Sequence, residues 1–239
     1  MTLQNKRVVV LGGTSGIGLA TANLAAEQGA EVFVVSSNPV SVKRALGTLP
    51  ATAHGDVADL TDATAVSEAF DRIGEFDHLV FTAGEPLTLL NVDTMDLDAA
   101  REAFQLRYFG ALGAVSAAVR HLRRGGSVVL TSGSATDRPG AGWSVAASIC
   151  GAVDSLVRAL AVELAPLRVN AVKPGVVKSP LWANMAEADR ERMYADTGKS
   201  ILLGRVGETS QIAEAYVFLM SQEFATGTIV TVDGGAALA

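Results

Sequence analysis

Three glycines near the start of the chain have the spacing of a phosphate-binding turn. Gly12, Gly16 and Gly18 follow an apolar, β-branched run at 8–11 and open a segment, 16–28, of helical composition. A strand, a tight turn and a helix N-terminus bring backbone N–H groups together, where the helix dipole favours negative charge. The missing Cβ atoms let a pyrophosphate approach the main chain. In this context the turn indicates a nucleotide site.

Composition narrows the class of protein and the partners. The 239 residues carry a net charge of −6, which argues against nucleic acid as a main partner, because phosphate binding needs clustered Lys and Arg. One cysteine, Cys150, rules out an internal disulfide and suits a reducing, cytoplasmic location. No signal peptide fits before the first strand, and no run reaches the roughly eighteen apolar residues of a membrane span. His54, His78 and His121 lack ligand spacing, so no metal is predicted.

Strand-like and helical segments alternate almost from end to end. Strands are expected at 6–12, 31–36, 51–55, 77–82, 126–132, 167–173 and 227–232, and helices at 16–28, 40–46, 62–73, 97–123, 145–165 and 209–221. This alternation predicts an α/β fold: a doubly wound parallel sheet of about seven strands between two helical layers. No linker divides residues 1–239, so one dinucleotide-binding domain is expected. Residues 176–208 break the rhythm, and a segment placed after a strand in this way is expected to cover a ligand.

The spacing Gly12-x3-Gly16-x-Gly18 resembles the short-chain dehydrogenase/reductase family, and the likeness extends over nearly the whole chain. Residues 77–84 resemble its strand-4 motif, with Phe81 and Thr82 where two asparagines are usual. Residues 168–177 resemble its strand-6 motif, and 204–207 and 232–235 its C-terminal signatures. The resemblance implies a Rossmann-type fold, a nicotinamide dinucleotide and a small-molecule substrate.

The resemblance also implies which residues meet the cofactor. The glycine turn would hold the pyrophosphate, the end of strand 3 the adenine, and the ends of strands 4 and 6 the nicotinamide side. The residues are Gly12, Thr14, Ser15, Gly16, Ile17, Gly18, Asp56, Val57, Thr82, Ala83, Gly84, Pro174, Gly175, Val177 and Ser179.

The end of strand 2 bears on which dinucleotide binds. Ser36, Ser37 and Asn38 stand there, where NAD-selective sites carry a carboxylate that repels a 2′-phosphate. The absence of an acid favours NADP(H). NAD(H) stays possible, because the arginine that NADP-dependent relatives often carry near Ser37 is absent too.

The residues that transfer a proton in the family are missing from this chain. Relatives use a Tyr and a Lys four residues later, on one helix face, so that the ammonium lowers the phenol's pKa. In the register set by the second half of the helix at 145–165, Ala146 and Cys150 stand there, which makes the chain an atypical member. The asparagine position falls on Arg107, and the serine position on Gly133 or, with one deletion, on Ser134.

Other side chains are candidates for the missing chemistry. Ser132 and Ser134 could hydrogen-bond a carbonyl, and Arg107 could supply positive charge, although arginine does not release its proton. Lys173 could reach the site, but solvation at a strand end is the favoured interpretation. Cys150 is interpreted as inert core.

Two functions stay open. The first is an NADP(H)-binding oxidoreductase that acts on a carbonyl, an imine or an activated C=C bond with a non-standard proton donor, because hydride transfer belongs to the cofactor. The second is a redox-inactive relative that serves as a cofactor sensor, a scaffold or a non-redox accessory protein. The resemblance further implies a homodimer or homotetramer through the small-residue faces of helices 97–123 and 145–165.

Overall fold

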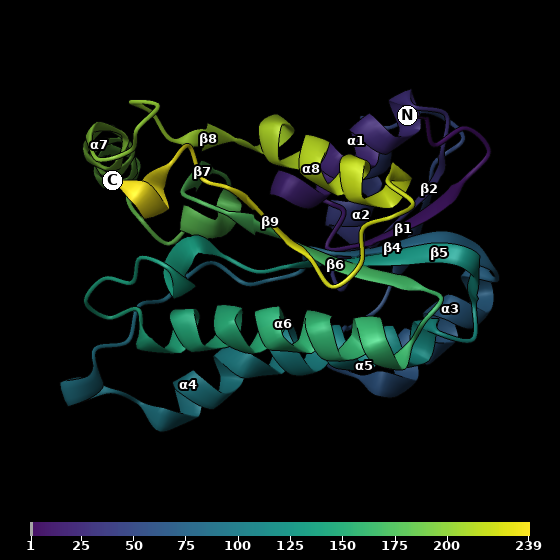
Figure 1. Cartoon of the computed structure of the whole chain (residues 1–239), viewed down its shortest axis with the longest axis horizontal. Coiled ribbons are helices and arrows are strands. Elements are labelled where there is room, and N and C mark those ends of the chain that lie inside the picture. Colours follow the sequence, from purple (N-terminus) through teal and green to yellow (C-terminus); the bar gives the residue numbers. More distant parts are fainter. Residues whose placement is uncertain (1) are drawn as a thin grey trace.

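Seven parallel strands form one central sheet in the computed structural model, which describes residues 2–239 (Figure 1). Their order across the sheet is β3-β2-β1-β4-β5-β6-β9. The strands are β1 (Arg7–Leu11), β2 (Glu31–Ser36), β3 (His54–Val57), β4 (Phe76–Phe81), β5 (Leu122–Thr131), β6 (Arg168–Pro174) and β9 (Ile229–Val232). The predicted α/β fold with a doubly wound parallel sheet is confirmed.

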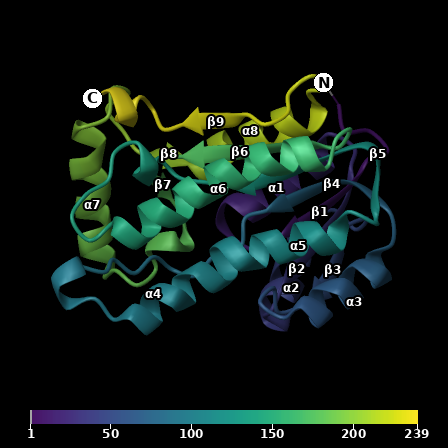
Figure 2. The same ribbon diagram turned by 60° about the horizontal axis from the view of Figure 1, so that its bottom comes forward.

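Helices cover both faces of this sheet (Figures 1 and 2). One face carries α1 (Gly16–Glu27), α2 (Pro39–Leu46) and α8 (Thr209–Ser221), and the other carries α3 (Ala63–Ile73), α5 (Ala111–Ala118) and α6 (Ser144–Glu163). Successive residues of β1 enter opposite cores: Val9 packs in the α3, α5 and α6 layer, and Val10 in the α1 and α8 layer. Burial on both faces explains why this strand is continuously apolar.

The strand order reverses at β1, which pairs with β2 on one side and β4 on the other. In a doubly wound sheet this reversal leaves a crevice at the carboxyl ends of the two strands, where ligands bind. The turn that leads from β1 into α1 lies at this crevice. The topology therefore places the glycine turn where a doubly wound sheet binds its ligand, as the sequence predicts for a nucleotide site.

The predicted helix 97–123 is wrong in its middle and at its end. The chain forms α4 (Leu97–Phe104), a π-helical turn (Gln105–Gly110) and α5, and β5 begins at Leu122 rather than at 126. A π turn inserts one extra residue and occurs mostly at functional sites, which sequence periodicity does not detect. Here the turn contains Arg107.

Strand β3, at His54–Val57, begins three residues later than the predicted 51–55. The cause is a turn at its entrance, closed by the hydrogen bond from the Ala53 nitrogen to the Pro50 oxygen at 2.9 Å. Proline supplies no N–H to a ladder, so pairing with β2 starts only after this turn.

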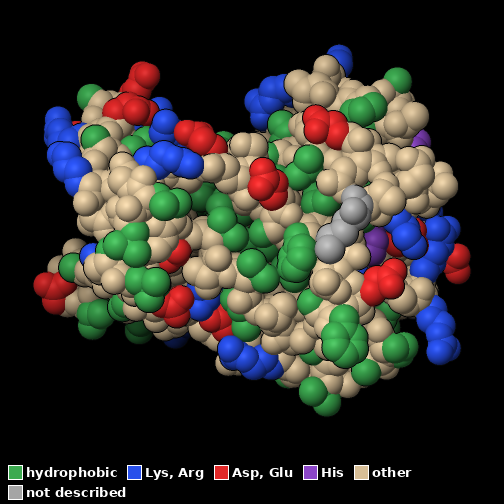
Figure 3. All heavy atoms as spheres, turned by 45° about the horizontal axis from the view of Figure 1, so that its top comes forward, with side chains coloured by type: hydrophobic (Ala, Val, Ile, Leu, Met, Phe, Trp, Pro, Cys, Tyr) green, Lys and Arg blue, Asp and Glu red, His purple; other side chains and the backbone are tan. Residues whose placement is uncertain are grey.

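Residues 176–208, which break the alternation of strands and helices, form four short elements. They contain β7 (Val177–Lys178), the 3₁₀ turn Pro180–Trp182, α7 (Glu187–Lys199) and β8 (Gly207–Glu208). The strands β7 and β8 pair in parallel as a second small sheet, which the sequence analysis missed. Figure 2 shows α7 beyond the carboxyl ends of the main strands, and Figure 3 shows charged side chains gathered at this end of the molecule.

By length and composition one helix of the described chain, α6, is apolar enough to cross a membrane, with a mean hydropathy of 1.7. It nevertheless lies along β6 (Figure 1) and places the buried Asp154 against the sheet. The core helix of a soluble protein passes the same test, so length alone is weak support for a membrane span.

Candidate functional site

The glycine turn packs directly on the end of β4. Gly12 has a φ of +82°, and a Cβ atom built on it lies 2.5 Å from the Ala83 nitrogen. A Cβ on Gly18 lies 2.3 Å from the Gly12 oxygen. The Thr82 hydroxyl donates to the Leu11 oxygen at 3.1 Å and so ties the two strand ends together. No other residue type fits Gly12 or Gly18 without movement of the backbone.

The first turn of α1 has no side-chain cap, unlike its neighbours. Asn38 caps α2 and Asp62 caps α3 with side-chain oxygens, whereas within the described residues the Ser15 side chain makes no capping bond. Backbone N–H groups at a helix start without a cap are a site for an anion. Thr14 and Ile17 flank this turn, and a Cβ on Gly16 lies 3.1 Å from the Pro180 Cδ. The geometry fits the pyrophosphate of a dinucleotide.

The polar side chains of the turn after β2 already make hydrogen bonds within that turn. The Asn38 Oδ1 accepts from the Val40 and Ser41 nitrogens at 2.9 and 3.2 Å, and the Ser36 hydroxyl accepts from the Asn38 nitrogen at 3.3 Å. Ser37 is exposed. The turn contains no carboxylate, so its charge does not oppose a 2′-phosphate.

Asp56, at the end of β3, already has a strong partner. The Arg72 guanidinium pairs with both carboxylate oxygens at 2.9 and 3.2 Å, and the Val57 nitrogen donates to Oδ1 at 2.7 Å. Val57 itself is exposed. A base bound beside Asp56 would therefore meet the Arg72 side chain as well as a carboxylate.

The residues after β6 form a short frame on the other side of the crevice. Pro174 ends the strand, and the Gly175 nitrogen donates to the Val232 oxygen at 3.0 Å. The Val177 oxygen accepts from the Trp182 Nε1 at 3.0 Å, and Ser179 begins the 3₁₀ turn above Gly16. This frame brings the expected nicotinamide-side residues to the glycine turn.

Arg107 crosses the end of β4. Its guanidinium donates to the Glu85 backbone oxygen and lies 3.7 Å from the Glu85 carboxylate. A Cβ on Gly84 would lie only 2.6 Å from the Arg107 Nη1, so the glycine makes room for the guanidinium. Burial lowers the pKa of Arg107 from its ordinary value, and the Glu85 charge opposes that shift.

The two candidate serines have different environments. Ser132 is buried, and its hydroxyl donates inward to the Asp154 Oδ1 at 2.6 Å. Ser134 is half-buried and begins the 3₁₀ turn Ser134–Thr136. Ser134 is therefore the more accessible of the two hydroxyls.

A buried ion network, absent from the predicted site, joins β5, β6 and α6. Lys173 is 7% exposed, and its Nζ lies 2.9 Å from the Asp154 Oδ2 and 3.0 Å from the Asp137 Oδ2. The favoured interpretation of Lys173 as a solvated strand end is thus wrong. Burial acts to lower its pKa, but hydrogen bonds to both carboxylates outweigh burial and raise the pKa. The feature of the sequence that could have revealed this network is a lysine within the buried strand β6.

Cys150 contacts this network through its backbone oxygen, which accepts from the Ser132 hydroxyl at 3.3 Å, and Ala146, one turn earlier on α6, carries no functional group. A Cβ on Gly133 lies 3.0 Å from the Cys150 Sγ, which places the thiol against the end of β5. Burial raises the pKa of the Cys150 thiol to about 11, although the Arg107 charge acts in the opposite direction. The thiol is therefore protonated at neutral pH.

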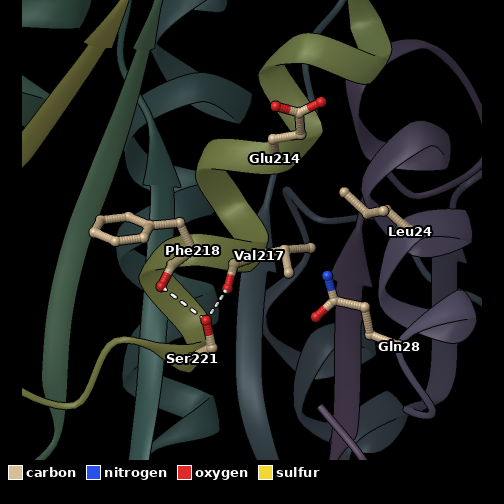
Figure 4. Close-up of a pocket in the computed structure, with 6 residues that line it drawn as sticks. All are labelled: Leu24, Gln28, Glu214, Val217, Phe218 and Ser221. Carbon is tan, nitrogen blue, oxygen red and sulfur yellow. Dashed lines mark hydrogen bonds between the residues drawn. The ribbon is translucent and has the colours of Figure 1, made fainter. Parts of the chain in front are cut away.

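A separate hollow of about 220 Å³ lies between α1 and α8 (Figure 4). Its lining residues are Leu24, Gln28, Glu214, Val217, Phe218 and Ser221. Leu24 and Gln28 lie at the end of α1 opposite to the glycine turn, so this hollow is distinct from the crevice.

The sheet order and the uncapped glycine turn after β1 together define a Rossmann-type fold. A family model described as enoyl-(acyl carrier protein) reductase matches residues 12–237. A short-chain dehydrogenase/reductase of Stachybotrys chlorohalonatus, ATR9, is 35% identical over 99% of this chain and 99% of its own length. The chain belongs to the short-chain dehydrogenase/reductase family of oxidoreductases.

Solved structures agree with this assignment. A small-chain dehydrogenase crystallised in complex with NADPH is 35% identical, with a TM-score of 0.87 over 99% of this chain and 100% of that one. The MalC Reductase/Diels-Alderase of Malbranchea aurantiaca is 29% identical, with a TM-score of 0.92 over 99% of this chain and 98% of that one.

Proposed function

We propose that this protein is an NADP(H)-dependent reductase of a small molecule, with an imine or iminium carbon as the best-fitting acceptor. Carbonyl groups and activated C=C bonds are the other acceptors of the same class. The observation that carries the proposal is the composition of α6: Ala146 offers no proton, and Cys150 is a half-buried thiol whose pKa desolvation raises to about 11. An acceptor that needs no proton on oxygen suits such a site.

The nucleotide half supports NADP(H). The uncapped first turn of α1 provides N–H groups for a pyrophosphate, and the turn after β2 has no carboxylate to repel a 2′-phosphate. The small-chain dehydrogenase structure, 35% identical, holds NADPH. When bound, the nicotinamide group supplies the hydride.

The chain's own residues would orient the acceptor and, for a carbonyl or an activated C=C bond, polarise it. Arg107 brings a guanidinium to the end of β4, where it can stabilise the negative charge that develops on these two acceptors without giving up its proton. The Ser134 hydroxyl can donate a hydrogen bond to a polar acceptor group. A proton, where one is needed, would come from water or from the substrate.

Two measurements on the purified protein test this function. Fluorescence titration should show tighter binding of NADPH than of NADH, and NADPH absorbance should fall fastest with iminium acceptors among ketones, imines and enones. Clearly tighter NADH binding would overturn the cofactor preference. Tight NADPH binding without oxidation by any acceptor would favour the sensor or scaffold function instead.

We also propose that the chain assembles as a homodimer or homotetramer. Large apolar side chains are exposed along α4, the π turn and α6, among them Leu97, Phe109 and Val162. Light scattering after size-exclusion chromatography measures the mass of the assembly, and a monomer at micromolar concentration would contradict the proposal.

A further inference from the structure

The neighbouring strands β4 and β5 separate before either strand ends. Backbone pairing between them ends at Val80 and Val129, although β4 continues to Phe81 and β5 to Thr131. On its other edge β5 stays paired with β6 as far as Thr131 and Val172. The two strands therefore diverge at the carboxyl edge of the sheet, the edge on which a doubly wound fold binds its ligand.

Two hydroxyl groups bridge this divergence. The Thr131 hydroxyl donates to the Phe81 backbone oxygen at 2.6 Å, and the Tyr216 hydroxyl lies 2.6 Å from the same Thr131 oxygen. Thr131 has one hydroxyl proton, which it gives to a carbonyl that can only accept, so Tyr216 is the donor in the second bond. The chain of donors runs from Tyr216 on α8 through Thr131 on β5 to the main chain of β4.

The Tyr216 phenol has a buried and apolar environment. The side chain is fully buried among the apolar residues that pack between the sheet and α8. Burial raises the pKa of Tyr216 far above its ordinary value, so the hydroxyl keeps its proton and acts as a donor. Burial of a hydroxyl is costly unless it is hydrogen-bonded, and Thr131 supplies that bond.

The other edge of β4 is held by different bonds. The Thr82 nitrogen donates to the Leu11 oxygen at 2.9 Å, and the Thr82 hydroxyl donates to the same oxygen at 3.1 Å. A Cβ on Gly12 would lie 2.5 Å from the Ala83 nitrogen, so the two chains are in direct contact. The ends of β1 and β4 thus stay together without Thr131, whereas the spacing between the ends of β4 and β5 depends on its hydroxyl.

We propose that Thr131, oriented by Tyr216, is a positioning residue for the nicotinamide half of the dinucleotide. A dinucleotide binds across the crevice, with its adenosine half toward β2 and its nicotinamide half toward β4, β5 and β6. The hydroxyl bridge sets the spacing between Thr82–Gly84 and the residues that follow β5, and so determines how the nicotinamide is held between them. This inference rests on the proposed NADP(H) cofactor.

Calorimetry with two ligands tests the positioning role: NADPH, and 2′,5′-ADP, which contains only the adenosine half. Thr131→Val removes the hydroxyl at nearly constant shape and should raise the Kd for NADPH about tenfold, while the Kd for 2′,5′-ADP changes by less than about twofold. Tyr216→Phe leaves the bond from Thr131 to Phe81 in place and should raise the Kd for NADPH only about threefold. Thr131→Ser keeps a hydroxyl and should recover wild-type affinity.

Ser127→Ala is the matched control for a general loosening of the sheet. The Ser127 hydroxyl lies 2.9 Å from the His78 Nδ1, and so joins β4 and β5 at the amino edge of the sheet, opposite to Thr131. Both side chains are buried, so the loss of this bond should lower stability to urea. It should change neither Kd. If Ser127→Ala weakens NADPH binding as much as Thr131→Val does, the positioning role is overturned.

The remaining outcomes separate this inference from the cofactor proposal. Equal weakening of both ligands in Thr131→Val, or no weakening, overturns the positioning role while NADPH binding to the wild type still supports the cofactor. Wild-type protein that binds neither ligand overturns the cofactor proposal and the positioning role with it. Urea unfolding gives the folded fraction of each variant. If Thr131→Val does not fold, the same comparison of two ligands in Tyr216→Phe decides the outcome.

Discussion

The two halves of the crevice are built from different parts of the chain. Around β1 and β4 the site consists of backbone: the turn at Gly12, the first turn of α1, and the main chain at Ala83, against which a Cβ on Gly12 would lie 2.5 Å away. Around β5 and β6 it consists of side chains, with Ser132, Asp154, Lys173 and Asp137 joined by ionic and hydrogen bonds.

This difference shows why the two halves can diverge independently. A backbone site needs only the correct path of the chain and glycine where a Cβ would collide. A side-chain site changes its chemistry with each substitution, although the fold stays the same. The family resemblance is accordingly strong in the nucleotide half, whereas the network around Lys173 could not be carried over from the family.

The largest expected effect is on stability, in the side-chain half. Lys173→Met leaves Asp154 as a buried, unpaired carboxylate, so the free energy of unfolding should fall by about 3–5 kcal/mol. Urea denaturation measures the loss. Lys178→Met is the matched control, since Lys178 pairs with Glu208 where both side chains are half exposed, and it should lose at most about 1 kcal/mol. Equal losses would contradict a buried network.

The second effect concerns the thiol at the centre of the chemical half. Burial raises the pKa of Cys150 to about 11, so at neutral pH iodoacetamide should label it on the order of 10²-fold more slowly than a free cysteine. Mass spectrometry reports the site cleanly, because the chain has one cysteine. Arg107→Met should slow the labelling further, since the Arg107 charge lowers this pKa. Labelling in urea at the free-cysteine rate is the control, and the same rate in the native protein would show that the thiol is open.

The nucleotide half was predictable from sequence because its signals are local. The glycine spacing, the apolar run of β1 and the alternation of elements all lie within short segments. The network was not predictable, because Ser132, Asp137, Asp154 and Lys173 meet only through the packing of three elements. The π turn around Arg107 and the pairing of β7 with β8 escaped for related reasons: the first disrupts helical periodicity by one residue, and the second joins strands of two residues each.

The third prediction concerns the half of the crevice that is built from backbone, and it compares two glycines within helices, Gly18 and Gly113. A Cβ on Gly18 lies 2.3 Å from the Gly12 oxygen and 2.4 Å from the Thr82 hydroxyl, so Gly18→Ala should cost about 1–3 kcal/mol of stability and weaken NADPH binding. A Cβ on Gly113, in α5, meets no described atom within 4 Å, so Gly113→Ala should stabilise by about 0.5–1 kcal/mol. Thermal and urea unfolding measure both. If Gly18→Ala binds NADPH normally, the turn is not the pyrophosphate site.

The smallest expected effect distinguishes a residue that stabilises the fold, Asn38, from a residue that binds the cofactor, Ser15, within the nucleotide half of the crevice. Asn38 caps α2 through two backbone nitrogens, so Asn38→Ala should lower the free energy of unfolding by about 1 kcal/mol. Ser15 makes no capping bond within the described chain, so Ser15→Ala should leave stability unchanged but weaken NADPH binding about fivefold through one lost hydrogen bond. Urea denaturation and fluorescence titration give the two values for each variant. A stability loss in Ser15→Ala without cofactor would mean that the hydroxyl caps α1 after all, and that the first turn of α1 does not depend on a phosphate to satisfy it.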